Sequence, residues 1–422
     1  MRAGTSQVDM NTTRTVAIVG AGYAGVLAAN RLQASLTETE RLSMSIVMVN
    51  PRAVFIDRIR LHQLAAGTTD AATIPLDHVL HPDVTVIVGE VTRILPERNG
   101  IVIDAAKGPI ELPYDVLIYA VGSGAPPSIP GGASSHSVGT HDEALMAGAA
   151  VRRLVPGNRI VVVGGGATGV EMASELAEEN PQMDIVLVSA GLLLSSLPQR
   201  GRKYVKSTLA FLNVQVVENE RVVHVDMNFV ELEGGRRIRS DLTIWTGSFT
   251  VPALARASAL AVDAAGRLLV TETLQHQAYP NIIGAGDSVS VHGDAGKHLR
   301  MGCAVAAPMG GHAAVTALAY LRCQPPTALS IGFFIRCLSL GRRNGFVQHV
   351  GKDDVPKRVQ LSGRAGAWVK ERICVGVISG IQKERTSPGS YWTAPAPGAR
   401  TFLRGARRLN QSRVVAGRKK AP

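Results

Sequence analysis

The chain has 422 residues, a formal net charge of +12 and four cysteines. Its length suffices for two or three domains with separate cores, and its 45% of hydrophobic residues is ordinary for a globular protein. Aromatic residues make up only 4%, too few for extended base-stacking surfaces, so nucleic acid is not expected as a partner. The cysteines form no CxxC pair, which argues against a disulfide scaffold or a zinc site and indicates a reducing compartment.

Two segments bear on membrane contact. Residues 1–14 contain no apolar stretch of the kind found in secretory signals. Residues 303–321 are the most apolar run, but Pro308 and two glycines interrupt it, so we expect a buried helix of small residues rather than a membrane span. The expected location is cytoplasmic, and a peripheral position on the inner face of the membrane stays open.

The first expected element is a strand at 15–19 that ends in a glycine-rich turn, followed by a helix at 23–35 and a strand at 45–49. Strand, tight turn and helix are the setting in which a GxGxxG sequence binds a dinucleotide. The glycines let the backbone approach the pyrophosphate, and the free N–H groups at the helix N-terminus hold it. The residues expected to bind the dinucleotide here are Gly20, Ala21, Gly22, Tyr23, Ala24 and Gly25.

A strand and a small β-meander come next. The expected strands lie at 84–88, 91–95, 101–104 and 110–112. A buried strand at 116–120 follows and is closed by a glycine, and we expect Ala120 and Gly122 among the cofactor-binding residues. The Pro-, Gly- and Ser-rich segment 122–139 then marks a domain boundary.

The same pattern begins again with a strand at 159–163, a second glycine-rich turn and a helix at 168–179. The later expected elements are a strand at 184–188, a helix at 203–212, a strand at 214–217, a meander at 222–226, 229–232 and 236–239, and a closing strand at 242–245. The residues expected to bind a second dinucleotide are Gly164, Gly165, Gly166, Ala167, Thr168, Gly169 and Gly247. Two such units imply two dinucleotides held against each other, and hydride transfer between nicotinamide and flavin needs this arrangement.

An acidic residue that grips the adenosine ribose usually follows such a fingerprint after roughly 20 residues. Asn50 takes that place in the first unit and Ser189 in the second, and we expect both to contact a cofactor. Asn50 can accept a ribose hydrogen bond without charge assistance. Ser189 lacks the carboxylate that would repel a 2′-phosphate, so the choice between NADH and NADPH stays open.

With the late motif PNIIGAGDSV and the segment YDVLIYAVGS, these fingerprints resemble the two-dinucleotide flavoprotein superfamily of pyridine nucleotide oxidoreductases. Within it the chain is similar to type II NADH dehydrogenases and to the apoptosis-inducing-factor-like ferroptosis suppressor. The resemblance covers about residues 14–350. It implies that the first fingerprint binds FAD, that the second binds NAD(P)H, that Asp287 contacts the ribityl chain of FAD and that the backbone near Val91 contacts adenine. The segment Leu338–Arg342 is also similar to a C-terminal segment of these relatives.

The resemblance also implies that Glu171, expected on the first turn of its helix, lies near the contact of flavin and nicotinamide. There it would orient the carboxamide or relay a proton, and the alternative is a helix-terminal charge favoured by the dipole. His62 is expected near the flavin ring, where a packing or solvent-facing role is favoured over a catalytic one. The helix after the late motif, at 302–312, lacks the paired glutamines of type II dehydrogenases, which leaves quinone as the acceptor in question. No disulfide relay is expected, since the first helix has no CxxxxC, and no metal site is expected.

The predicted fold is α/β, with two Rossmann-like dinucleotide-binding domains that each carry a β-meander insertion, and a small C-terminal domain. The expected ranges are 14–125 with 255–325 for a discontinuous FAD-binding domain, 140–254 for an NAD(P)-binding domain, 326–385 for the C-terminal domain and 386–422 for a basic tail. The last 25 residues hold eight basic side chains and no acidic one. Such a tail is either a solvated flexible segment or a contact with anionic lipid, and contact with nucleic acid is a weaker third alternative.

The predicted function is that of an FAD-dependent NAD(P)H oxidoreductase. The second substrate is expected to be a quinone, a small-molecule oxidant or an electron-transfer protein, in that order. The alternative is a flavin-bound redox sensor or scaffold with little turnover, motivated by the net charge of +12. A monomer or a homodimer is expected.

Overall fold

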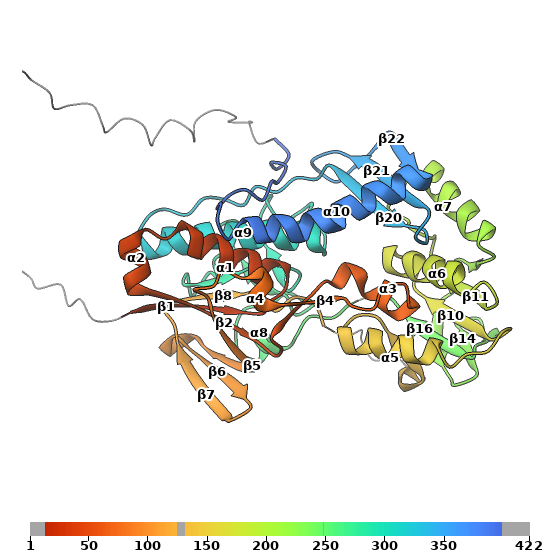
Figure 1. Cartoon of the computed structure of the whole chain (residues 1–422), viewed down its shortest axis with the longest axis horizontal. Coiled ribbons are helices and arrows are strands. Elements are labelled where there is room, and N and C mark those ends of the chain that lie inside the picture. The colour runs from red at the N-terminus through yellow and green to blue at the C-terminus, as the bar shows by residue number, and fades with distance from the viewer. Residues whose placement is uncertain (1–12, 125–130, 248, 399–422) are drawn as a thin grey trace, which may run out of the picture.

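The computed structural model describes residues 13–124, 131–247 and 249–398. Two sheets built around parallel strands lie side by side, as Figure 1 shows, with the first on the left and the second on the right. This confirms the predicted α/β class. The division into domain ranges stays a proposal.

The first sheet has seven strands in the order β18-β8-β1-β2-β5-β6-β7. Their bounds are Arg14–Val19 for β1, Met44–Asn50 for β2, Thr85–Leu95 for β5, Gly100–Ala105 for β6, Gly108–Pro113 for β7, Val116–Tyr119 for β8 and Ile282–Gly284 for β18. Strand β18 pairs in parallel with β8 although more than 160 residues separate them in the chain. The late Gly-Asp motif, which follows β18, is thereby brought beside the turn that follows β1.

Strand β5 departs from the prediction of two separate strands at 84–88 and 91–95. It runs without a break for 11 residues. Its first half pairs in parallel with β2 and its second half pairs antiparallel with β6. Gly89, where the break was expected, leaves room for β6, because a Cβ there would lie 2.7 Å from the Ile103 side chain. Gly89 therefore allows β6 to lie close to β5, and it does not end a strand.

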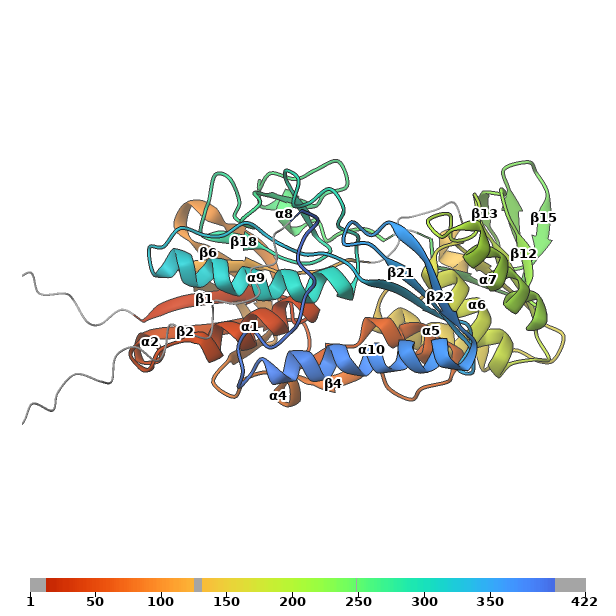
Figure 2. The same cartoon turned by 90° about the horizontal axis from the view of Figure 1, so that it is seen from above.

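Helices α1 (Tyr23–Ser35) and α9 (Cys303–Leu321) cover one face of the first sheet, and α10 (Gly363–Lys383) packs on α1 and runs on to the strands β21 (Gly345–Val350) and β22 (Pro356–Ser362), as Figures 1 and 2 show. Helix α9 is the buried small-residue helix predicted from the sequence, and it continues through Pro308. It is the one described helix that is long and apolar enough to cross a membrane, yet 78% of that window is buried within the protein. A Cβ added at Gly310 would collide with the Ala24 carbonyl oxygen of α1, so small residues permit this close helix packing.

The second sheet has five strands in the order β12-β11-β10-β16-β9. Their bounds are Ser135–Ser137 for β9, Arg159–Val163 for β10, Asp184–Val188 for β11, Gln215–Val217 for β12 and Leu242–Trp245 for β16. The antiparallel meander predicted beside it consists of β13 (Val222–Val225), β14 (Phe229–Leu232) and β15 (Arg237–Arg239). Strand β9 lies in the segment read as a domain link, of which 125–130 fall outside the described residues.

Helices pack on the second sheet as the strand–helix alternation predicts, with two differences at the boundaries. Helix α6 spans Ala167–Glu179, while α7 begins at Gln199, four residues earlier than expected, because Pro198 stands at its N-cap. Helix α5 (His141–Val151) was not predicted and starts with a capping box of Thr140 and Glu143. The short helix α3 (Leu61–Ala66), which comes from the first unit, contributes to the same hydrophobic core as α5 and α6. It therefore ties the two units together.

The C-terminal region forms an antiparallel sheet of β20 (Ile335–Ser339), β21 (Gly345–Val350) and β22 (Pro356–Ser362), followed by α10. The end of α10 is anchored by Glu384, whose side chain is fully buried and pairs with Arg31 of α1 at 2.7 Å. The long α10 was not predicted, because its glycines lower helix propensity and hide the pattern. The predicted basic tail lies, from residue 399 on, outside the described residues.

Candidate functional site

Each of the two fingerprints forms a sharp turn between a strand and a helix. Gly20 and Gly164 have φ values of +101° and +132°, a region that side-chain-bearing residues avoid. A Cβ added at Gly25 would collide with the Gly20 carbonyl oxygen, and one at Gly169 would collide with that of Gly164. The third glycine of each fingerprint is therefore needed for helix and strand to touch, as the sequence predicts.

The helices that follow these turns begin with free donors. Gly22 is the N-cap of α1 and Gly166 is the N-cap of α6, and neither helix has a side-chain cap or an acidic residue in its first turn. Nothing lies within 4 Å of a Cβ added at Gly22 or Gly166. First-turn N–H groups that face open space, with the positive end of the helix dipole behind them, suit a pyrophosphate. Both turns therefore fit a dinucleotide.

One large cavity, of about 1110 Å³, extends from the second fingerprint to the first unit. From the second unit it is lined by residues 164–168, Ser189 and Gly247, and from the first unit by Tyr23 and Asp287. Glu171 lines it as well. The predicted residues that do not line this cavity are Gly20, Ala21, Gly22, Ala24, Gly25, Asn50, Val91, Ala120, Gly122 and Gly169. The structure thus brings the second cradle, Glu171 and the Gly-Asp motif to one space.

Several of these other residues shape the first turn. The Asn50 carboxamide oxygen accepts a hydrogen bond from the Ala21 N–H at 2.9 Å, so Asn50 fixes the end of β2 against the turn. A Cβ on Gly20 would collide with the Ala120 carbonyl oxygen, which places Ala120 directly beside the turn. Val91 is buried in β5 opposite Ile103. No local pattern predicted that Asn50 would bind the backbone of the first turn.

Asp287 lines the cavity between the two units. Its Oδ1 accepts a hydrogen bond from the Gly302 N–H at 2.8 Å, just before α9 begins. Burial raises the pKa of this carboxyl, while Gly302 and the nearby Arg58 lower it. Because Gly302 occupies only one of the two carboxylate oxygens, the other can accept a ligand hydroxyl, as the predicted ribityl contact requires.

Glu171 makes a buried ion pair that the sequence did not predict. It is the fifth residue of α6 and so lies on the second helical turn, which corrects the expected first-turn position. Its Oε1 lies 3.0 Å from the Lys370 ammonium of α10, and it accepts a hydrogen bond from the Ser339 N–H at 2.9 Å. The side chains of Glu171 and Lys370 are only 11% and 13% exposed. Since a specific partner holds this carboxylate, a helix-dipole role does not explain it.

Comparison with known proteins agrees with this geometry. Residues 14–314 match the model of the pyridine nucleotide-disulphide oxidoreductase family. The chain belongs to that family. It is therefore an oxidoreductase that uses FAD and NAD(P)H, as predicted.

Individual relatives of this oxidoreductase support the assignment. An NADH dehydrogenase-like protein of Mycobacterium tuberculosis is 29% identical over 347 residues, which cover 77% of this chain and 85% of the relative. Ferroptosis suppressor protein 1 of Xenopus tropicalis is 26% identical over 82% of this chain and 91% of its own. The sulfide:quinone oxidoreductase of Aquifex aeolicus shares the fold, with a TM-score of 0.76 and 17% identity over 92% of this chain and all of that one.

The electrostatics of the oxidoreductase site follow from burial and pairing. Burial alone would raise the pKa of Glu171, but Lys370 and His62 lower it below its usual value. For Lys370, burial acts against the charge, but Glu171 raises its pKa well above the usual range. Burial lowers the pKa of His62 to about 4, so the imidazole is neutral at physiological pH. The site thus places the ion pair of Glu171 and Lys370 beside a neutral imidazole.

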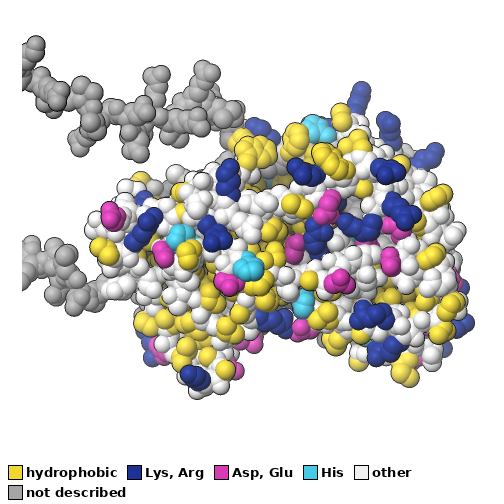
Figure 3. All heavy atoms as spheres, in the orientation of Figure 1, with side chains coloured by type: hydrophobic (Ala, Val, Ile, Leu, Met, Phe, Trp, Pro, Cys, Tyr) yellow, Lys and Arg dark blue, Asp and Glu magenta, His cyan; other side chains and the backbone are white. Residues whose placement is uncertain are grey.

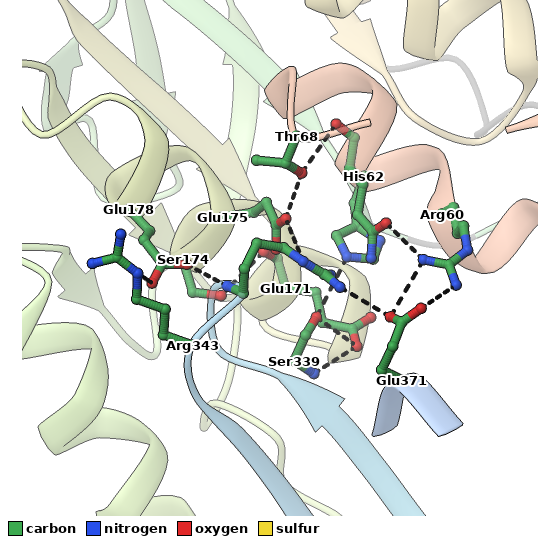
Figure 4. A network of polar contacts seen from close by, with 12 residues as sticks. Arg60, His62, Thr68, Glu171, Ser174, Glu175, Glu178, Ser339, Arg343 and Glu371 are labelled. Atoms are coloured by element: carbon green, nitrogen blue, oxygen red, sulfur yellow. Dashed lines mark hydrogen bonds and ion pairs between the residues drawn. The ribbon is translucent and has the colours of Figure 1, made fainter. Parts of the chain in front are cut away.

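Ser339 connects these groups, as Figure 4 shows. Its hydroxyl lies 3.3 Å from Glu171 Oε1 and 3.4 Å from His62 Nε2, and all three residues are buried. A packing role for His62 does not account for its contact with the Ser339 hydroxyl. The resemblance at residues 338–342 singled out the Ser339 segment, but Lys370 lies on the unpredicted α10, and no local signal marked it.

Proposed function

We propose that this oxidoreductase transfers two electrons from NAD(P)H by way of FAD to a quinone. Bound FAD supplies the redox chemistry, since it accepts the hydride of the nicotinamide and passes the electrons on. The observation that carries the proposal is the single cavity that joins the second fingerprint to Asp287 and Glu171. Two reacting rings in one cavity gain from proximity, an effect worth about 7–11 kcal/mol in well-oriented reactions.

The chain's own residues bind, orient and exchange protons. The residues Gly20 to Gly25 and the N-terminus of α1 hold the FAD pyrophosphate. Asp287 accepts a hydrogen bond from a ribityl hydroxyl. Residues 164–169 and the α6 N-terminus hold the NAD(P)H pyrophosphate. Glu171 orients the carboxamide, and Lys370 keeps that carboxylate ionised. The neutral His62 is available to donate or accept a proton through Ser339.

An apolar wall near Lys370 supports a ring-shaped, apolar acceptor. This side of the cavity is lined by Met301, Ile335, Leu338 and Ile373, with Arg300 beside them. An apolar cavity with a few polar groups is the usual setting for a small organic ligand. This wall and the Lys370 ammonium would then contact the quinone in place of the paired glutamines that residues 302–312 lack.

We propose that both NADH and NADPH are used. The Ser189 side chain lies against Gly165. Its hydroxyl is neutral, whereas a carboxylate at this position would repel the 2′-phosphate of NADPH. Glu220 and Arg221 line the same end of the cavity, so one carboxylate and one guanidinium are available for the adenosine ribose. A ribose hydroxyl suits Glu220 and a 2′-phosphate suits Arg221.

The test is the absorbance of the flavin when the purified protein is mixed anaerobically with NADH or NADPH in a stopped-flow instrument. Rapid bleaching, followed by reoxidation with a soluble quinone analogue, is expected. Bleaching without turnover by a quinone, a dye or an electron-transfer protein would contradict the enzyme proposal and favour the redox sensor. A folded protein that binds no flavin would overturn both.

A contact with an anionic membrane surface is a second proposal. Large apolar side chains are exposed around the C-terminal sheet: Phe334 at 58%, Val359 at 67%, Trp368 at 66% and Trp392 at 73%. Figure 3 shows yellow hydrophobic and dark blue Lys and Arg side chains together along the upper edge, over β22 and α10. Exposed apolar residues mixed with cations suit a lipid interface.

Truncation after Pro397 removes the basic tail. We expect it to weaken binding to vesicles that contain anionic lipid and to leave flavin reduction unchanged, because the described residues that line the cavity end at Ile373. Vesicle sedimentation, with neutral vesicles as the control, measures this effect. Equal sedimentation of the full and truncated chains would contradict the role given to the tail.

A further inference from the structure

Glu175 is a fully buried carboxyl that the proposed chemistry leaves unused. It lies on α6 one helical turn after Glu171 and is 0% exposed. Its Oε1 accepts a hydrogen bond from the Thr68 hydroxyl at 2.5 Å, while no described residue hydrogen bonds to its buried Oε2. An ionised carboxylate with an unpaired oxygen inside a protein is costly, and most of that cost is removed when the oxygen carries a proton, because a neutral unpaired group costs far less to bury than a charge.

The charged groups around Glu175 only partly compensate the negative charge of its ionised form. The charged groups that act on it are Glu171 and Glu178 of its own helix and Arg342 from the turn after β20, and Arg342 in turn pairs with Glu371 of α10. Arg342 is the nearest cation, with its Nε 3.6 Å from Glu175 Oε1, but its other end is shared with Glu371 at 3.0 Å. Figure 4 shows three of the glutamates of α6 in a row, from Glu178 through Glu175 to Glu171.

Burial raises the pKa of Glu175 to about 7, against the lowering effects of Thr68 and Arg342. The carboxyl therefore gains or loses its proton near neutral pH. Glu171 differs, because Lys370 holds it ionised. Two carboxyls on one helix face thus have pKa values that are pushed apart by their partners, the pattern that marks an acid and base pair.

We propose that Glu175 is the proton reservoir of the reductive site, a positioning residue that stores a proton one helical turn behind Glu171. The inference rests on the proposed function. Reduction of a quinone by NAD(P)H converts NAD(P)H, one proton and quinone into NAD(P)⁺ and quinol. The hydride brings two electrons and one proton, so one further proton enters from water in each turnover.

The geometry gives that proton a route. Residues one turn apart on a helix have Cβ atoms about 5–6 Å apart, which places Glu175 beside Glu171, and the Ser339 hydroxyl lies between Glu171 and His62. Glu175 releases its proton toward this cluster and regains one from the outer end of α6. There the Glu178 side chain is 20% exposed and lies beside Arg343, which is 90% exposed.

The test is Glu175→Gln, which keeps the acceptor for Thr68 and the side-chain volume but carries no exchangeable acid proton. Infrared spectra of the oxidised protein, with no NAD(P)H added, are expected to show one protonated carboxyl band that titrates near pH 7 and that the variant lacks. Quinone reduction should fall about 100-fold, the lower end of the effect of a lost proton-transfer group, and lose its ionisation near neutral pH. Glu179→Gln, on an exposed position of the same helix, is the matched control.

Stability gives a second readout. A folded pKa of about 7 against the usual 4.5 means that the folded chain binds more protons between these values. The stability that Glu175 contributes is complete below the lower value and is lost as the pH rises through the upper one. The melting temperature of the wild type should therefore fall across this window relative to Glu175→Gln.

Should Glu175→Gln fail to fold, Thr68→Val serves instead. It removes the hydroxyl that stabilises the ionised form, so the carboxyl band and the rate profile should both shift to higher pH. A variant with an unchanged band and pH profile would overturn the proton-reservoir role. Failure of NAD(P)H to bleach the wild-type flavin would instead overturn the proposed function, so the two failures are distinguishable.

Discussion

Lys370→Met is expected to destabilise the folded protein by about 3–5 kcal/mol, the usual cost of leaving one member of a buried ion pair alone. Glu171 is 8% exposed, and Lys370 is the only described cation that forms an ion pair with it. Burial, which already acts to raise the pKa of Glu171, would then be opposed only by His62 and the Ser339 hydrogen bond. The carboxyl would take up a proton at higher pH than in the wild type.

The pH dependence of this destabilisation has a definite sign. In the wild type the lowered pKa of Glu171 gives stability that is present above the usual value of 4.5 and lost as the pH falls through the folded pKa. In Lys370→Met the folded pKa is raised, so stability is lost as the pH rises. The difference between the two proteins should therefore be largest at alkaline pH and shrink toward acid pH in urea unfolding.

Matched variants separate charge from volume. Lys370→Arg keeps the charge and should retain most of the stability. The double variant Glu171→Gln with Lys370→Met removes both charges and should be more stable than Lys370→Met alone, since no unpaired carboxylate is left. Flavin reduction by NAD(P)H should slow about 100-fold in Lys370→Met. Equal stability of the single variant and the wild type at alkaline pH would show that the pair is not buried as described.

Gly169→Val and Gly25→Val are expected to abolish different binding events. The Cβ that valine adds at Gly169 would collide with the Gly164 carbonyl oxygen and push α6 away from β10. The first-turn N–H groups would then miss the pyrophosphate, and a displacement of about 1 Å can cost about 100-fold. We therefore expect Gly169→Val to bind flavin normally and to need at least about 100-fold more NAD(P)H for bleaching.

The corresponding change in the first unit gives the opposite result. A Cβ at Gly25 would collide with the Gly20 carbonyl oxygen, so Gly25→Val should be isolated without flavin. Absorption spectra measure the flavin, and bleaching against nucleotide concentration measures NAD(P)H binding. Gly234→Ala, in the meander turn with nothing within 4 Å of the added Cβ, is the control for glycine replacement. Loss of flavin in Gly169→Val but not in Gly25→Val would reverse the assignment of the two cradles.

The two cradles could be read from the sequence because their signals are local. In each unit a short β-branched strand, a glycine-rich turn and a helix follow one another within about 20 residues, and steric limits on the backbone fix the conformation of such a turn. Strands β10 and β11 and helix α1 lie at the predicted residues. The small-residue composition of α9 was likewise enough to predict a buried helix.

The partners of Glu171, Glu175 and Asn50 could not be read in this way. Lys370 reaches Glu171 from a helix whose glycines hid its pattern, and Thr68 reaches Glu175 from the turn after α3. The single β5, where two strands were expected, depends on β2 on one side and β6 on the other. Such features arise from contacts between segments that are distant in the chain, so no local pattern encodes them.

The sequence by itself therefore determined the fold class, the family and the two dinucleotide turns, because each depends on backbone geometry that a few neighbouring residues impose. Only the tertiary structure decided which charges the site holds. The ionisation of Glu171, His62 and Glu175 depends on burial and on partners from α3, β20 and α10. Burial and pairing exist only after these segments have packed together.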